Sequence, residues 1–352
     1  MKTKALDRRI NYITFLSVVS SVSVVALHTN GVYWRFSSTE RYWITAGIIE
    51  CLLYYAVPVF FMITGATLLD FFERYGVLEF YKKRIAKSFI PYIFWSLVGG
   101  VLFNCFVLRT LKPTELSLKY IVDGLLTGGL VSVYWFFIPL FAVYIVLPLI
   151  AAVEQEKKTI VYMIIAITWF IFNSLIPFLK NVFHLWIPTS FTIPVGGNYV
   201  FYLLVGYLLD RNKIEKPWEI IIYIQGVIGL LLHFFGTYAL SIEAGEIIST
   251  YKGYLNVPCI MYSVSVFVFF KQFYNRLKVP GFIMYIVGVV SKYTFAIYLL
   301  HWHVIQIVIR LFKINVQSII YRLFSPIPIV ALIICIVFLL RKTKVFKLVL
   351  PS

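Results

Sequence analysis

The sequence has little charge and offers little polar surface for a soluble fold. Only 13% of its 352 residues are charged, 61% are hydrophobic, and the mean hydropathy is +0.88. A soluble domain of this length needs more charge to cover its surface, and this composition would leave large apolar patches in water. No long polar stretch, internal repeat or low-complexity segment is present. These absences exclude a soluble globular protein and indicate an integral membrane protein.

Several motifs of enzyme and metal chemistry are also missing. The sequence has no zinc-type cysteine and histidine spacing, no nucleophile elbow, no glycine-rich phosphate loop and no paired aspartates for a metal-dependent glycosyltransferase. We therefore expect no bound metal. The four cysteines all fall in apolar segments, where they are expected to act as small buried hydrophobes: Cys51, Cys105, Cys259 and Cys335.

Apolar runs predict an all-α bundle of about ten transmembrane helices, since a span needs about 20 apolar residues. We treat residues 1–352 as one integral membrane domain. The expected spans are 11–33, 43–69, 88–108, 131–153, 159–178, 191–209, 218–239, 254–270, 293–312 and 321–340. Two further segments are ambiguous. Residues 120–130 are compatible with a short amphipathic stretch on the outer face, and residues 281–292 are compatible with a segment along the inner face before the ninth span.

The net charge of +17 does not indicate nucleic-acid binding, because the basic residues are scattered among the breaks between apolar runs. With the N-terminus inside, 22 of the 32 lysines and arginines fall on the cytoplasmic side. Cytoplasmic loops of membrane proteins carry this excess. The pattern predicts ten spans with both termini in the cytoplasm, in a cell membrane.

An ionisable residue at membrane depth is a functional hypothesis by default. Thr14, Ser17, Ser21 and His28 recur at helical spacing in the first expected span. They should share one face, and a polar stripe ending in a base favours catalysis. The alternative is that the small side chains only permit close helix packing.

Two more candidates lie in other spans. Glu50 is expected at the same depth as His28, where its carboxylate would orient the imidazole; the alternative is an interfacial carboxylate that reaches water. In the ninth span, Tyr298 and His301 should share a face with Ser291 and Thr294. His301 is equally compatible with a purely structural hydrogen bond.

A basic cluster precedes the third expected span. Lys83, Arg84 and Lys87 recur at helical spacing, and such a cluster binds phosphates. The alternative is an ordinary topology signal in contact with anionic lipid.

Four segments resemble the acyltransferase-3 superfamily, whose integral membrane enzymes modify sugars and lipid-linked glycans of the bacterial envelope. They are Val24–His28 at the end of the first span, Val57–Gly65, Lys83–Leu97 and Ser291–His301. Their order and spacing along nearly the whole chain carry the resemblance. Three positions depart from the family pattern. Ser17 and Lys87 occupy places where the family has arginine, and Thr14 occupies a place where the family often has an acidic residue.

The resemblance implies an O-acyltransferase that moves an acyl group, expected to be acetyl, from acyl-CoA to a sugar hydroxyl. Arg84, Lys87 and Lys83 would hold the phosphates of acetyl-CoA, and the pantetheine arm would pass Ser17 toward His28. His28 would be the general base, oriented by Glu50, while His301 and Tyr298 would position the thioester or the acceptor. The partners implied are membrane lipids, acyl-CoA and a glycan of the bacterial surface.

Other classes remain open from the sequence alone. A transporter or flippase for a lipid-linked oligosaccharide would also carry polar stripes in its helices. It would be expected to show internal repeats, and none is visible. A purely structural membrane subunit would leave His28 unexplained.

Overall fold

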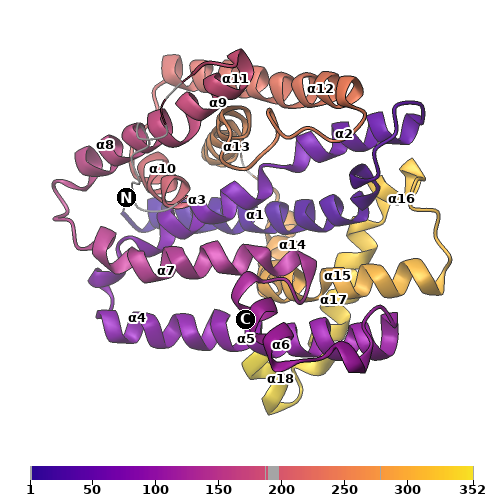
Figure 1. The fold of residues 1–352 in the computed structure, drawn as a ribbon. Coiled ribbons are helices and arrows are strands. Elements are labelled where there is room, and N and C mark those ends of the chain that lie inside the picture. The colour runs from indigo at the N-terminus through magenta and orange to yellow at the C-terminus, as the bar shows by residue number, and fades with distance from the viewer. Residues whose placement is uncertain (1, 187, 189–197, 278, 352) are drawn as a thin grey trace. The chain divides into compact units, whose positions relative to one another are not determined.

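The computed structural model describes residues 2–186, 188, 198–277 and 279–351, which form helices and no strands (Figure 1). The chain divides into two compact units. Unit 1 comprises Met1–Leu69, Val153–Ser291 and Asn315–Pro326, and unit 2 comprises Asp70–Ala152, Lys292–Ile314 and Ile327–Ser352. Within the described ranges, eight helical stretches are long and apolar enough to cross a membrane. The expected all-helical, multi-pass class is confirmed.

The eight stretches correspond to eight of the ten expected spans. They are Tyr12–Thr29, Arg41–Glu73, Val77–Leu108, Ser132–Ala151, Lys158–Phe183, Lys216–Ala244, Val257–Arg276 and Thr294–Leu311. The expected span 191–209 begins at residues outside the described ranges, and its described part is α10 (Val200–Arg211). The expected span 321–340 is divided into α16 (Ile319–Phe324) and α17 (Pro326–Leu340). Pro326 has no N–H to continue the first helix and suits the start of the second.

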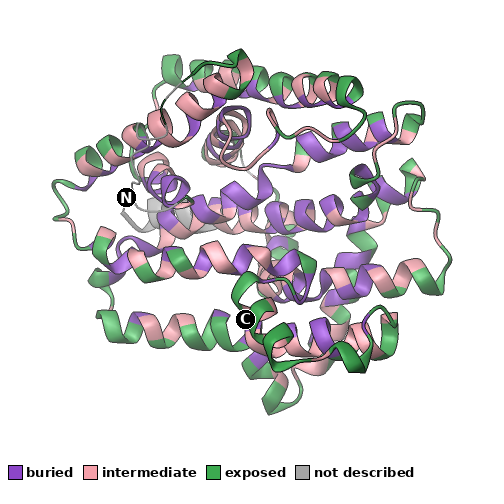
Figure 2. Ribbon diagram, viewed as in Figure 1, coloured by how far each residue is buried: buried purple, intermediate pink, exposed green. Residues whose placement is uncertain are grey.

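Unit 1 is built around α1 (Lys2–Thr29), which packs against α3 (Ala56–Leu68), α13 (Val257–Arg276) and α14 (Gly281–Ser291). Much of α1 and α3 is buried (Figure 2). Besides α10 and α16, the other described helices of unit 1 are η1 (Gly31–Trp34), α2 (Arg41–Leu53), α8 (Lys158–Phe170), η7 (Ile171–Leu175), α9 (Ile176–Phe183), α11 (Lys216–Leu231), η9 (Leu232–Gly236) and α12 (Thr237–Ala244). α14 covers part of the ambiguous segment 281–292.

Glycines let the helices of unit 1 approach one another closely. A Cβ on Gly65 of α3 would lie 1.8 Å from the Leu203 carbonyl oxygen of α10. A Cβ on Gly206 of α10 would lie 2.1 Å from the Met62 carbonyl oxygen of α3. Small residues at helix crossings are typical of membrane bundles, where van der Waals packing drives association. Gly65 ends the family-like segment Val57–Gly65, so part of that motif serves packing.

Unit 2 contains the basic cluster and the ninth expected span. Its helices are η2 (Phe71–Glu73), α4 (Val77–Arg84), η3 (Ile85–Phe89), α5 (Ile90–Trp95), η4 (Ser96–Leu108), η5 (Pro113–Glu115), α6 (Leu118–Thr127), η6 (Ser132–Phe136), α7 (Phe137–Ala151), α15 (Thr294–Leu311), α17 and α18 (Lys344–Val349). The Trp95 indole donates to the Val349 carbonyl at 2.8 Å and joins α5 to α18. α6 covers most of the ambiguous segment 120–130, and its Leu118, Val122 and Leu126 are exposed.

Candidate functional site

The polar stripe of the first span lies on one continuous helix. α1 contains Thr14, Ser17, Ser21 and His28 without interruption, so the helical spacing places them on one face, as predicted. Thr14, Ser17 and His28 are half-buried, whereas Ser21 is buried. The Ser21 hydroxyl donates to the Ser17 carbonyl oxygen at 2.9 Å. The Ser21 hydroxyl thus forms its hydrogen bond within the helix. For Ser21 this agrees with the alternative that small side chains in the stripe permit close helix packing.

Glu50 has a different partner from the expected one. Its carboxylate Oε1 lies 2.8 Å from Nζ of Lys252, and both side chains are buried. The expected pairing of Glu50 with His28 is therefore wrong. The physical reason is that a buried carboxylate gains most from a full positive charge, and Lys252 brings one from the segment between α12 and α13.

Aromatic rings enclose the ammonium group of Lys252. Its Nζ lies 3.6 Å from the centre of the Tyr54 ring and 5.1 Å from those of Tyr33 and Trp34. Such contacts stabilise a cation because the ring faces are negative. The cation is therefore held by ring faces as well as by the Glu50 carboxylate.

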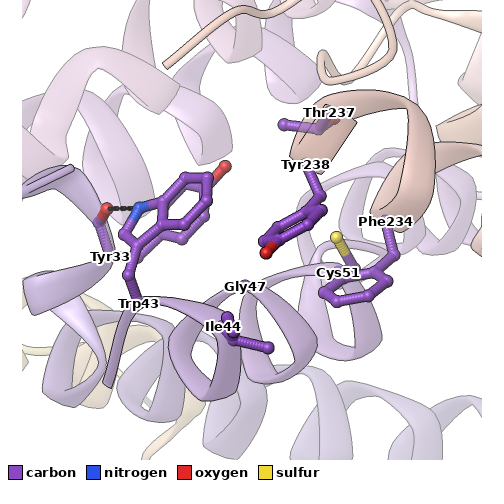
Figure 3. A pocket seen from close by; sticks show the side chains of 8 residues that line it. All are labelled: Tyr33, Trp43, Ile44, Gly47, Cys51, Phe234, Thr237 and Tyr238. Atoms are coloured by element: carbon purple, nitrogen blue, oxygen red, sulfur yellow. Dashed lines mark hydrogen bonds between the residues drawn. The ribbon is translucent and has the colours of Figure 1, made fainter. Parts of the chain in front are cut away.

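A small cavity lies beside this ion pair in unit 1. It has a volume of about 10 Å³, which is room for about one water molecule. Figure 3 shows its lining, with the stacked rings of Tyr33 and Trp43 on one side, the Tyr238 ring on the other, and Cys51 of α2 near Phe234. Within the described residues, the buried Tyr33 and Thr237 hydroxyls have no hydrogen-bond partner. The space accommodates a single hydroxyl or water, not a sugar ring.

The three residues of the basic cluster in unit 2 have different surroundings. Lys83 lies 3.5 Å from the Glu79 carboxylate and 3.9 Å from the centre of the Tyr75 ring. The half-buried Arg84 guanidinium lies over Phe80 and Tyr144, at 5.7 and 5.6 Å from their ring centres, while Lys87 is exposed. Within the described residues, neither Arg84 nor Lys87 forms an ion pair with a carboxylate. These two cations are therefore available to an anionic ligand.

The chain changes from α- to π-helix directly after Arg84. Ile85–Phe89 is π-helical, and α5 with Pro91 in its first turn follows it. A π-helical turn alters the faces on which successive side chains lie, and such turns are frequent at functional sites. It explains why Arg84 is half-buried and Lys87 exposed, although α-helical spacing predicted one common face.

His301 has a fixed ring orientation in unit 2. It is fully buried, and its Nδ1 lies 2.6 Å from the Tyr298 carbonyl oxygen. A carbonyl can only accept, so in the neutral ring Nδ1 carries the proton and Nε2 the lone pair. The Tyr298 hydroxyl donates to the Val133 carbonyl of η6. His301 and Tyr298 are thus adjacent on α15, as expected.

The rest of the expected span-nine stripe is divided between two helices. Ser291 is the last residue of α14, and its hydroxyl donates to the Gly288 carbonyl at 2.9 Å. Thr294 begins α15 after the turn at Lys292 and Tyr293. The expectation that Ser291 and His301 lie on one helix is therefore wrong, because the chain turns between them.

Sequence reasoning missed three buried cations of unit 1, which are Lys158, Lys252 and Arg322. Lys158 and Lys252 lie in segments between the expected spans, where basic residues indicate topology, and Arg322 lies at the start of the expected span 321–340. Only their contacts distinguish them from exposed loop charges. Within the described residues, no group of three or more histidines, cysteines or acidic residues is placed to hold a metal ion.

A family profile described as an acyltransferase domain, the acyltransferase-3 family, matches residues 10–340. The chain belongs to this family. The match extends from α1 into α17 and includes the stripe, the basic cluster and the His301 segment. No curated protein and no solved structure matches the chain. Membership supports acyl transfer within a multi-pass membrane protein.

Proposed function

We propose that the protein is a membrane-embedded O-acyltransferase that moves an acetyl group from acetyl-CoA to a sugar hydroxyl of a surface polysaccharide or lipid-linked glycan. The family match over residues 10–340 is the observation that carries this proposal. The scarcity of acidic residues in the spans and the absence of visible internal repeats favour it over a transporter. We place the protein in a bacterial plasma membrane.

In unit 1, His28 is the proposed general base. A sugar hydroxyl is a poor nucleophile until a base takes its proton during the attack. The imidazole of His28 is half-buried at the end of the α1 stripe. As the new ester bond forms, the thioester carbon–sulfur bond breaks, and CoA leaves as the thiol after gaining a proton. Glu50 has no part in this proposal, because it is paired with Lys252.

In unit 2, Arg84 and Lys87 are the proposed ligands of the acetyl-CoA phosphates. Their lack of carboxylate partners in the described ranges supports this role, since a phosphate would supply the missing negative charge. We propose a weaker part for Lys83, because its charge is already paired with Glu79. His301 and Tyr298 are proposed to position the thioester or the acceptor. Ser17 remains a proposed contact of the pantetheine arm in unit 1.

We further propose ten spans with both termini in the cytoplasm. The distribution of lysine and arginine supports this topology. Single cysteines at Lys157 and Lys213, both exposed, should then react only with reagents that reach the cytoplasm. A cysteine at the exposed Lys112 should react from outside. Reaction from outside at position 213 would contradict the ten-span arrangement.

The function is tested by deleting the gene in the native host and examining envelope glycans by NMR. The expected result is loss of O-acetyl signals, restored by the wild-type gene and not by a His28→Ala copy. Unchanged O-acetylation together with an accumulated lipid-linked precursor would favour a flippase instead.

A further inference from the structure

Arg322 of α16 is a buried cation without a buried anion. Only 1% of its surface is exposed. Its guanidinium donates to the Thr45 hydroxyl at 2.7 Å, the Asn30 side-chain oxygen at 3.2 Å, the Gln317 carbonyl at 3.2 Å and the Tyr42 carbonyl at 3.4 Å. All four acceptors are neutral, and no carboxylate in the described ranges pairs with it. Burying a charge without a charged partner is unfavourable. We therefore expect Arg322 to have a role that a neutral side chain cannot fill.

These contacts converge on the end of the helix that carries His28. Asn30 directly follows the last turn of α1 and also donates to the Ala46 carbonyl of α2 at 2.9 Å. The neighbouring Thr29 hydroxyl lies 3.5 Å from the Arg322 carbonyl oxygen. Helix ends fray unless their groups are bound. Arg322 thus ties the last turn of α1 to the first turn of α2.

We propose that Arg322 is a positioning residue that holds the terminal turn of α1, and so fixes the place and orientation of the His28 imidazole. This rests on the proposed function, in which His28 is the base. Only arginine fits this role, because its planar, forked donors reach Asn30, directly after α1, and acceptors on α2 at once. Lysine keeps the charge but loses the fork. Misplacing a reactive group by about 1 Å can lower a rate about 10²-fold.

The test compares Arg322→Lys with Arg341→Lys in the purified full chain. Arg341 is a matched control in unit 2, where its guanidinium donates to the backbone carbonyls of Lys292, Leu350 and Pro351. Arg322→Lys should lower kcat about 10- to 100-fold with an unchanged KM for acetyl-CoA. Arg341→Lys should lower only the melting temperature. Rates are expressed per folded molecule.

A second pair of variants separates positioning from general stability. Thr45→Val removes the hydroxyl that accepts the 2.7 Å bond at nearly constant volume, and Thr45→Ser keeps it. Thr45→Val should reduce kcat in the same direction as Arg322→Lys, and Thr45→Ser should not. If Arg322→Lys and Thr45→Val lower only the melting temperature, Arg322 is a structural tether and the inference is wrong.

A readout without catalysis keeps this inference distinct from the proposed function. With ¹⁵N-labelled histidine, the NMR signals of the His28 ring are identified by their loss in His28→Ala. They should move in Arg322→Lys and stay in place in Arg341→Lys. If the wild-type protein transfers no acetyl group, the proposed function fails. If the ring signals do not move, the positioning role of Arg322 fails.

Discussion

The Lys252 ammonium lies 2.8 Å from the Glu50 carboxylate, joining the segment between α12 and α13 to α2 through a buried ion pair. The rings of Tyr33, Trp34 and Tyr54 surround the cation. Two charges taken out of water stabilise a fold only if they remain paired. The pair therefore makes unit 1 sensitive to the loss of either partner.

The first prediction concerns this pair. Glu50→Gln should destabilise the protein by about 3–5 kcal/mol, because it leaves the Lys252 charge buried without a partner. The measurement is thermal unfolding of the purified protein in detergent. The control is the double variant Glu50→Leu with Lys252→Leu, in which no charge remains and most of the stability should return. Equal losses in the single and double variants would show that the charge pairing is not the cause.

The second prediction concerns the contact of α3 with α10. Gly65→Ala should destabilise unit 1 by about 1–3 kcal/mol or more, because the new methyl group would meet the Leu203 carbonyl at 1.8 Å and force the helices apart. Gly288→Ala on α14 is the matched control, since a Cβ there meets nothing within 4 Å. Alanine at that helical site should stabilise by about 0.5–1 kcal/mol. Similar unfolding temperatures for the two variants would contradict the close packing.

Whether the sequence alone predicts an arrangement depends on how far apart along the chain the interacting residues lie. The face shared by Thr14, Ser17 and His28 depends on helical periodicity within one segment, and it was predictable. The partner of Glu50 lies 202 residues away along the chain, and local pattern does not encode such a choice. The boundary between the segment 281–292 and the ninth span was predicted, but helical spacing alone wrongly extended the stripe of His301 across it to Ser291.

The third prediction concerns donor binding in unit 2. Arg84→Ala should weaken acetyl-CoA binding about 10- to 150-fold, because a charge-assisted contact contributes about 1.5–3 kcal/mol. Binding is measured by isothermal titration calorimetry with a non-hydrolysable acetyl-CoA analogue. The control is Lys342→Ala, which removes an exposed basic residue after α17. Equal affinities in the two variants would show that Arg84 does not bind the donor and would favour the alternative, a topology signal in contact with anionic lipid.

Two substitutions of Lys87 test its smaller expected contribution to acetyl-CoA binding. Because it is exposed and follows Arg84 within the π-helical segment, Lys87→Ala should weaken binding less than Arg84→Ala. Lys87→Arg should bind at least as tightly as the wild type, because a guanidinium contacts phosphate through two parallel bonds. Wild-type affinity in both Lys87→Ala and Lys87→Arg would show that position 87 does not contact the phosphates.

The last prediction concerns the base. His28→Ala should leave the protein folded but lower acetyl transfer about 10²- to 10⁴-fold, the usual effect of losing a general base. The assay follows release of the CoA thiol with a defined sugar acceptor, alongside unfolding temperature. His233→Ala is the matched control, since this histidine also belongs to unit 1, is fully buried in η9, and has no partner for either ring nitrogen among the described residues. It should lower stability through the cavity it leaves, with the rate per folded molecule unchanged. Wild-type transfer by His28→Ala would refute the proposed mechanism, while leaving the family membership intact.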